Sequence, residues 1–322
     1  MLKVLRRRLL QLIPLLLAVM VMNFALIQAA PGSFLDIMTA EQQVTDPKMI
    51  ERLRTTYGMD DPTPVQLGKY ILSVVRFDLG YSYRQNAPVS EVILSHLPAT
   101  AILMLASIGI AVLLGMLAGI VAAVKVNTVW DSLVSVMAVL CFAAPSFWLG
   151  IMLTVLFSVK LGWLPVGGMQ TVAMEGGFFA HTLDILKHLL LPALALGLFY
   201  AATYARVMRA SMLEVSRLDF VRTARAKGLS SLRVTLAHVL RNALLPIVTL
   251  LGLQLGMVLG GSVVIEAVFS WPGIGSLLFD SVSSRNFPMV LGVMLLSALL
   301  VAMANIAVDM LYMRLDPRIR IK

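Results

Sequence analysis

The sequence predicts an all-α protein that crosses a membrane six times, and three observations predict it. The 322-residue chain is 59% hydrophobic and 13% charged, and its mean hydropathy of +0.88 lies outside the range of soluble globular domains. Six apolar runs are long enough to cross about 30 Å of hydrocarbon. Lysine and arginine gather in alternate connecting segments, which is the pattern of a polytopic membrane protein with a fixed orientation.

The six predicted spans follow from length and hydropathy alone. The first has a competing interpretation, because "MLKVLRRRL" resembles the basic start of a signal peptide and "IQAAPGS" offers a small-residue cleavage site. Its apolar stretch of about 20 residues is longer than a typical signal core, which favours an uncleaved span. The predicted spans are residues 9–30, 99–124, 132–159, 188–206, 243–269 and 289–313.

Charge placement predicts which loops face the cytoplasm. Of the 26 Lys and Arg residues, 17 fall at the N-terminus, at Lys125, between Arg206 and Arg241, and at the C-terminus. Both termini are therefore expected to be cytoplasmic, and the net charge of +9 indicates membrane topology rather than nucleic-acid binding. We divide the chain into 1–30 (N-terminus and first span), 31–98 (extracytoplasmic), 99–313 (five-helix core with a cytoplasmic loop at 207–242) and 314–322 (cytoplasmic tail).

The extracytoplasmic segment 31–98 contains two short amphipathic patterns, in "PKMIERLRTTYG" and "PVQLGKYILSVVRFDLG". Each predicts a helix with one apolar face. These helices either lie at the membrane interface and cap the bundle, or help to receive a partner or substrate.

Glycines at four-residue spacing predict close helix packing. Gly252, Gly256 and Gly260 share one face of the fifth span, and Gly115 and Gly119 form a shorter version in the second. Whether the partner helix belongs to this chain or to another subunit stays open, with packing inside the chain as the default.

Acidic residues avoid the centres of the spans. Glu266 lies near the outer end of the fifth span and Asp309 near the inner end of the sixth, with Arg314 about one turn beyond. We interpret both carboxylates as interfacial caps or ion-pair partners rather than as carriers of charge.

Motifs for catalysis are absent from the sequence. It has no G-x-x-x-x-G-K-[ST] for ATP phosphates, no G-x-S-x-G and no H-E-x-x-H. The single cysteine, Cys141, excludes a disulfide within the chain, and the four histidines are scattered without metal-ligand spacing. No cofactor is therefore expected in this chain.

The cationic passage "DFVRTARAKGLSSLRVTLAHVLRNALLP" is the one stretch that invites a functional interpretation. Asp219 is a suitable N-cap, Phe220, Val221 and Ala224 share a helix face, and Gly228 is a natural stop. This predicts a two-turn helix that is too short to be stable alone and must dock on something.

A second helix is expected after the turn "GLSS". Ser230 or Ser231 can cap it, and it leads through Pro246 into the fifth span. An anchor on anionic lipid would explain the cations of this loop but not the capped and stopped short helix. The residues predicted to line one face of the second helix are Leu232, Leu236, Val239, Leu240 and Ala243.

"RTARAKG" followed by "HVLRNALLP" resembles the EAA loop of ATP-binding-cassette (ABC) importer permeases, in the form of the dipeptide, oligopeptide and nickel branch. Ala224 and Gly228 match the general pattern, whereas Arg222 and Thr223 stand at its Glu and first Ala positions. The resemblance covers nearly the whole chain, including "LPATAILML", "VFSWPGIGSLL" and "NIAVDMLYMRLDPRIR". "APGSF" departs from the Pro-Gly-Asp-Pro common in the branch.

This resemblance implies a type I ABC importer permease fold with a cytoplasmic EAA-loop coupling helix. It further implies a second homologous permease, two ATPase subunits that bind ATP and Mg, an extracytoplasmic solute-binding protein and the lipid of the inner membrane. The coupling helix is expected to seat on the ATPase, from Asp219 onward. Its docking core would be Phe220, Val221, Ala224 and Gly228, with Arg222, Arg225 and Lys227 as a polar rim.

The function expected from the resemblance is ATP-driven import of di- or oligopeptides by alternating access, with ATP hydrolysis left to the partner subunits. Import of a nickel complex or of glutathione is the alternative within the branch. An ion-coupled secondary transporter and a non-transporting membrane scaffold or enzyme are the alternatives outside it.

Overall fold

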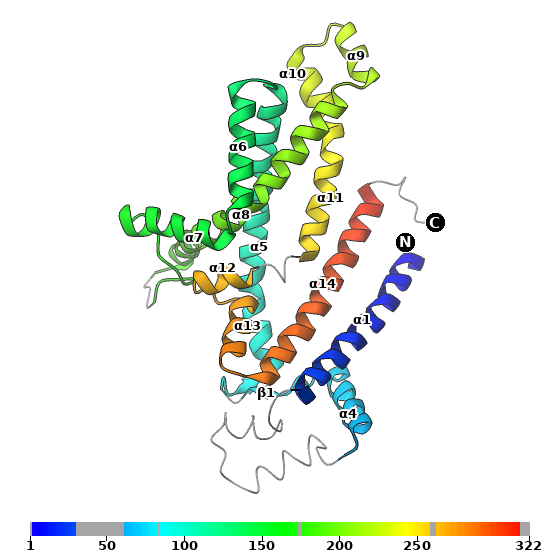
Figure 1. Cartoon of the computed structure of the whole chain (residues 1–322), viewed down its shortest axis with the longest axis vertical. Coiled ribbons are helices and arrows are strands. Elements are labelled where there is room, and N and C mark those ends of the chain that lie inside the picture. The colour runs from blue at the N-terminus through cyan, green and yellow to red at the C-terminus, as the bar shows by residue number, and fades with distance from the viewer. Residues whose placement is uncertain (1, 30–60, 83, 173–175, 258–261, 316–322) are drawn as a thin grey trace.

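The computed structural model is helical almost throughout and describes residues 2–29, 61–82, 84–172, 176–257 and 262–315. Long helices run along the molecule, and shorter ones lie across it (Figure 1). Five helical stretches are long and apolar enough to cross a membrane, and a bent pair makes a sixth. The five are in α1 (Leu2–Ala29), α5 (Val89–Val124), α8 (Phe178–Val215), the stretch from α10 (Ser231–Arg233) into α11 (Arg241–Met257), and α14 (Phe287–Leu315).

The third predicted span, 132–159, is not one straight helix. α6 (Val129–Ala143) is followed by α7 (Ser146–Thr154) and η1 (Val155–Lys160), and the two parts meet at 102°. Pro145 explains the break, because a proline disfavours the helical conformation of the residue before it, and Ala144 is extended with φ −75° and ψ 131°. α7 therefore projects sideways in Figure 1, and the prediction of a continuous span is wrong here.

The fifth predicted span, 243–269, is also divided. α11 ends at Met257, and α12 (Val263–Val268) and α13 (Ile274–Ser283) follow as separate short helices. Gly252 is buried and Gly256 lies in α11, but Gly260 is outside the described residues. The structure therefore places only two of the three predicted glycines, Gly252 and Gly256, on one helix.

The shorter glycine pair is confirmed as a packing seam within the chain. A Cβ on Gly115 would lie 2.6 Å from the Ala201 carbonyl oxygen, and one on Gly119 would lie 2.6 Å from that of Ala205. Both distances are far inside van der Waals contact, so only glycine allows α5 and α8 to approach so closely. This helix pair forms the centre of the bundle.

One end of the molecule is built by α4 (Thr63–Val75), a two-stranded antiparallel hairpin, and α13 (Figure 1). The hairpin pairs β1 (Tyr81–Ser82) with β2 (Ala87–Pro88), and the Asn286 side-chain amide donates to the Ser82 hydroxyl at 2.8 Å. The second predicted amphipathic helix is confirmed as α4, while the first, around 49–57, falls outside the described residues.

Glu266 caps a helix in the interior rather than at an interface, and it forms no ion pair with any of the residues that the structure describes. It lies in α12, is fully buried, and accepts hydrogen bonds from the hydroxyls of Thr100 (2.9 Å) and Ser262 (2.5 Å). Its second oxygen accepts the backbone N–H of Ser276 at 3.0 Å, in the first turn of α13. The carboxylate thus joins α12, α13 and α5. Asp309 lies in α14, but its side chain is outside what the structure describes.

Candidate functional site

The cytoplasmic loop predicted at 207–242 is a compact helical unit at the end of α8. α9 (Asp219–Ala226) follows α8 after a three-residue turn, and α10 and η2 (Val234–Leu240) lead from it into α11. This unit lies at one end of the molecule, beyond the α5–α6 connection (Figure 1).

α9 begins one residue earlier than predicted. Leu218 is the N-cap, and its carbonyl oxygen accepts the backbone N–H groups of Val221 and Arg222. Asp219 is therefore in the first turn rather than at the cap, and its carboxylate lies 3.5 Å from the Arg222 guanidinium on the exposed surface. An acid in the first turn still favours the helix, because it faces the positive end of the helix dipole.

The end of α9 is as predicted. Gly228 has φ +78°, a conformation that other residues adopt at a cost. Its N–H donates to the Arg225 carbonyl at 2.9 Å, and the Leu229 N–H donates to the Ala224 carbonyl at 3.4 Å. This pair of bonds is a Schellman motif, which stops the helix and turns the chain toward α10.

The apolar face of α9 is covered by the chain itself. Val221 is 0% exposed and Ala224 is 5% exposed, and both belong to one buried cluster with the end of α8. The assignment of these two residues to a docking core is therefore corrected: they hold α9 onto its own protein. Other members of this cluster are Met212, Val215, Val234, Val239, Ala243 and Ile247.

The outward surface of α9 is aromatic and cationic. Phe220 is 41% exposed, and Arg222, Arg225 and Lys227 are exposed beside it. Gly228 is exposed as well, with no atom within 4 Å of the place where a Cβ would stand. Of the four residues predicted as a docking core, Phe220 and Gly228 remain accessible to a partner.

The buried face of the second helix matches the prediction in its later half, where Val239 and Ala243 are buried, but not in its earlier half. Val234 and Val239 are buried, five residues apart, while Leu232 and Leu236 are 70% and 51% exposed. A spacing of five is that of the π-helix, in which each backbone N–H bonds five residues back, and η2 is such a segment. The prediction placed Leu232 and Leu236 inward because it assumed 3.6 residues per turn throughout.

A salt bridge between Asp131 and Arg209 holds α6 against α8, six residues before α8 ends at Val215. The Arg209 guanidinium donates to both oxygens of Asp131, at 2.6 and 2.8 Å, and the Asn127 N–H donates to the same carboxylate at 3.0 Å. Such a two-pronged pair fixes orientation as well as distance. Sequence reasoning missed this pair, because Arg209 was counted only as part of the cationic loop.

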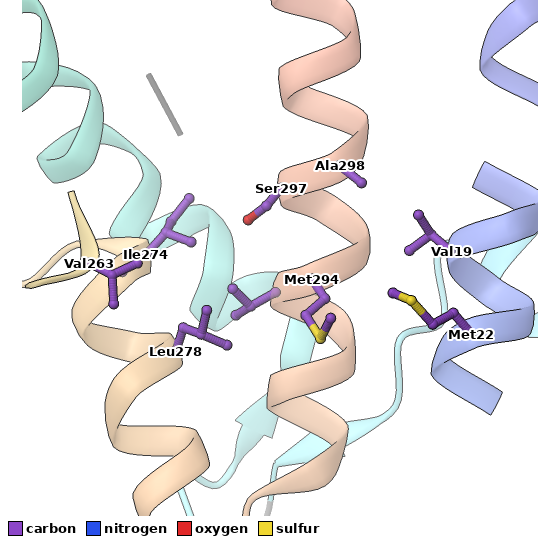
Figure 2. A pocket seen from close by; sticks show the side chains of 10 residues that line it. Val19, Met22, Val263, Ile274, Leu278, Met294, Ser297 and Ala298 are labelled. Carbon is purple, nitrogen blue, oxygen red and sulfur yellow. The ribbon is translucent and has the colours of Figure 1, made fainter. Parts of the chain in front are cut away.

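A cavity of about 290 Å³ lies among α1, α13 and α14 (Figure 2). Figure 2 shows α14 between the other two helices, with Leu278, Met294 and Met22 among the side chains that line it. Ser297 supplies the only polar side chain of the lining. The cavity therefore offers no charged group to a polar ligand. Among the described residues, no three His, Cys, Asp or Glu side chains come together as a metal site would require.

Comparison with known proteins agrees with this architecture. Among solved structures, the MetNI methionine ABC transporter in an inward-facing conformation matches with a TM-score of 0.52 and 16% identity. The match covers 70% of this chain and 96% of that one, and it shows that this chain has the type I ABC importer permease fold.

Two curated relatives match over nearly their whole length. The di/tripeptide transport system permease protein DppB of Pseudomonas aeruginosa is 41% identical, over 99% of both chains. The oligopeptide transport system permease protein AppB of Bacillus subtilis is 39% identical, over 97% of this chain and 98% of its own.

The family comparison covers both halves of the chain. Residues 115–321 match the binding-protein-dependent transport system inner membrane component, and residues 1–104 match the N-terminal region of such components. The spans and these matches lead to one conclusion: the chain belongs to the family of binding-protein-dependent transport system inner membrane components.

Proposed function

We propose that this chain is the membrane permease subunit of an ATP-driven importer of di- or oligopeptides. The substrate class is supported by the two relatives named for di/tripeptide and oligopeptide transport, at about 40% identity over nearly the full chain. The chain itself is not an enzyme: its sequence carries no ATP-binding motif, so ATP and Mg belong to partner ATPase subunits.

The observation that carries this proposal is the way α9 is held. An isolated helix of eight residues is not stable in water. Here the burial of Val221 and Ala224 and the Schellman stop at Gly228 fix it in place before any partner arrives. Its outward residues, Phe220, Arg222, Arg225 and Lys227, then form a preformed coupling surface. An aromatic side chain beside cations suits a groove with acidic groups on an ATPase subunit.

The complex that fits this surface contains two permeases, two ATPases and an extracytoplasmic solute-binding protein. The positive-inside distribution supports a cytoplasmic position for both termini and for α9. α9 would then face the ATPases, and the hairpin and α4 at the other end would face the binding protein.

Movement of α9 would pass to the spans through its packed contacts. Val221 and Ala224 share a buried cluster with α8, η2 and α11, so a push on α9 tilts these helices together. The Asp131–Arg209 pair adds α6 to the same moving body. In this mechanism, closure of the ATPases drives alternating access by rigid-body tilting.

The proposal is tested by reversing one charge on the coupling surface. Arg225→Glu is compared with Arg233→Glu, because both arginines are exposed and belong to the same loop, but only Arg225 lies on α9. Arg225→Glu carries a small penalty, about 0.3–1 kcal/mol, because it places an acid in the last turn of α9. Arg233 lies in the first turn of the continuous helical stretch that begins at Ser231, where an acid is favoured. The chain is tagged in its native cell, and co-purifying subunits and uptake of a labelled dipeptide are measured.

We expect Arg225→Glu to lose the ATPases and dipeptide uptake while keeping the second permease, and Arg233→Glu to keep all three. Normal ATPase retention and uptake by Arg225→Glu would contradict the coupling role of α9. Uptake of nickel or glutathione without dipeptide uptake by the unaltered protein would contradict the substrate class.

A further inference from the structure

α4 packs along α1 in the opposite direction, and three contacts set the register. The Gln28 side-chain amide donates to the Gln66 side-chain oxygen at 3.0 Å, and the rings of Phe24 and Tyr70 have centroids 6.3 Å apart. Met20 and Val74 then meet in one buried cluster with α14. Each step of four residues up α4 is a step of four residues back along α1.

This register gives the depth of α4 in the membrane. The candidate span in α1 ends at Leu26, and Gln28 lies beyond it. Met20 is six residues inside that end, which is about 9 Å along the helix at 1.5 Å per residue. Val74 is level with Met20, so α4 enters at the boundary and its last turns lie level with the outer part of the span. Interfacial helices bury their apolar face by about this depth.

The side of α4 away from α1 is exposed and has the composition of a lipid-facing surface. Leu72 is 50% exposed and Val75 is 66% exposed, whereas Val74 on the opposite side is buried. Lys69 and Arg76 are exposed next to these apolar residues, and the Lys69 ammonium is ion-paired with Asp61 at 2.5 Å. Apolar side chains beside cations match the acyl chains and phosphates of phospholipid.

Phe77 ends α4 in a conformation that a bulky residue rarely adopts. Its φ is +63°, and its side chain is 66% exposed. A bulky residue in this backbone conformation costs free energy, so the exposed position of the Phe77 ring indicates a functional role for the ring. In the register above, Phe77 lies beyond Val74 at the deeper end of α4, and Phe is a residue that membrane-surface helices place among the acyl chains.

We propose that α4 is a lipid-binding helix, with Leu72, Val75 and Phe77 among the acyl chains and Lys69 and Arg76 at the phosphates. The charge of Arg76 limits how far the helix sinks, because a long cationic side chain reaches back to the headgroups. In this position α4 fastens the outer hairpin to the bilayer surface. The inference depends on the membrane span of α1 and not on which substrate is carried.

The test uses single cysteines, since the described chain has one native thiol, Cys141, which is replaced by serine. Leu72→Cys and Val75→Cys are compared with Thr63→Cys, which is exposed at the water end of the same helix. The complete complex is placed in phospholipid nanodiscs and treated with a membrane-impermeant maleimide. Spin labels on the same thiols are tested for collision with oxygen and with a water-soluble nickel chelate.

We expect thiols at 72 and 75 to react at least about tenfold more slowly than the thiol at 63, because the reactive thiolate is disfavoured away from water. Their spin labels should meet oxygen more often than nickel. Reaction at the rate of Thr63→Cys would show a water-facing surface and overturn the proposal. Protection that appears only when the second permease or the solute-binding protein is present would also overturn it, in favour of a protein contact. Neither result bears on the coupling role of α9.

Discussion

At the scale of single residues, the sequence located polar groups but not their partners. Glu266 stood out as an acid in an apolar run, yet its partner Thr100 is 166 residues away. The Thr100 hydroxyl donates to Glu266 and also accepts the Ile274 N–H at 2.8 Å, so one side chain serves two buried groups. The pattern "LPATAILML" contains no sign of this double role. Such a pairing is set by how α5, α12 and α13 meet, which periodicity does not reveal.

Thr100→Val should therefore destabilise the protein more than an ordinary hydroxyl deletion. It leaves an acceptor on Glu266 and a donor on Ile274 without their partner in a buried place, and each such loss costs about 1–3 kcal/mol. Thermal unfolding of the assembled complex measures the effect. Thr182→Val is the control, because that exposed hydroxyl bonds only to the carbonyl of its own helix. Equal melting temperatures for the two variants would contradict the network.

At the scale of elements, helix periodicity and stop signals predicted α9 to within one residue, together with Gly228 as its end. They failed where the backbone leaves the regular helix. Pro145 was read as part of a span, although it breaks the span by 102°. In η2, Val234 is buried and Leu236 is exposed, although the helical period had predicted Leu236 to face inward. Hydropathy counts apolar residues and does not register bends or changes of pitch.

The close packing of α5 on α8 can be tested with two glycines of α5, one at the contact and one away from it. Gly115→Ala places a methyl group 2.6 Å from the Ala201 carbonyl oxygen and should force the helices apart, at a cost of about 1–3 kcal/mol. Gly109→Ala meets no atom within 4 Å and should be neutral or stabilising by about 0.5–1 kcal/mol. The melting temperatures of the two complexes, compared with the unaltered one, check this. A more stable Gly115→Ala would show that the seam is not tightly packed.

At the scale of the whole molecule, composition and hydropathy predicted the membrane class and four of the six spans, and the resemblance predicted the family that the comparisons confirm. What sequence could not give is which face of α9 is free. Val221 and Ala224 looked available because no pattern shows that α8 and η2 cover them. The structure buries Val221 and Ala224 of the predicted docking core and leaves Phe220 exposed beside the cations. Under our proposal the coupling site is therefore the exposed side of α9, while its buried side packs against the protein's own helices.

The most direct measurement of this central claim is photo-crosslinking in living cells from a benzophenone amino acid at position 220. Position 232 is the control, since Leu232 is also an exposed apolar residue of the same loop but lies off α9. We predict that mass spectrometry will identify an ABC ATPase subunit joined to position 220 and far less of it joined to position 232. Crosslinking of the ATPase from position 232 alone, or only lipid adducts from position 220, would contradict the account.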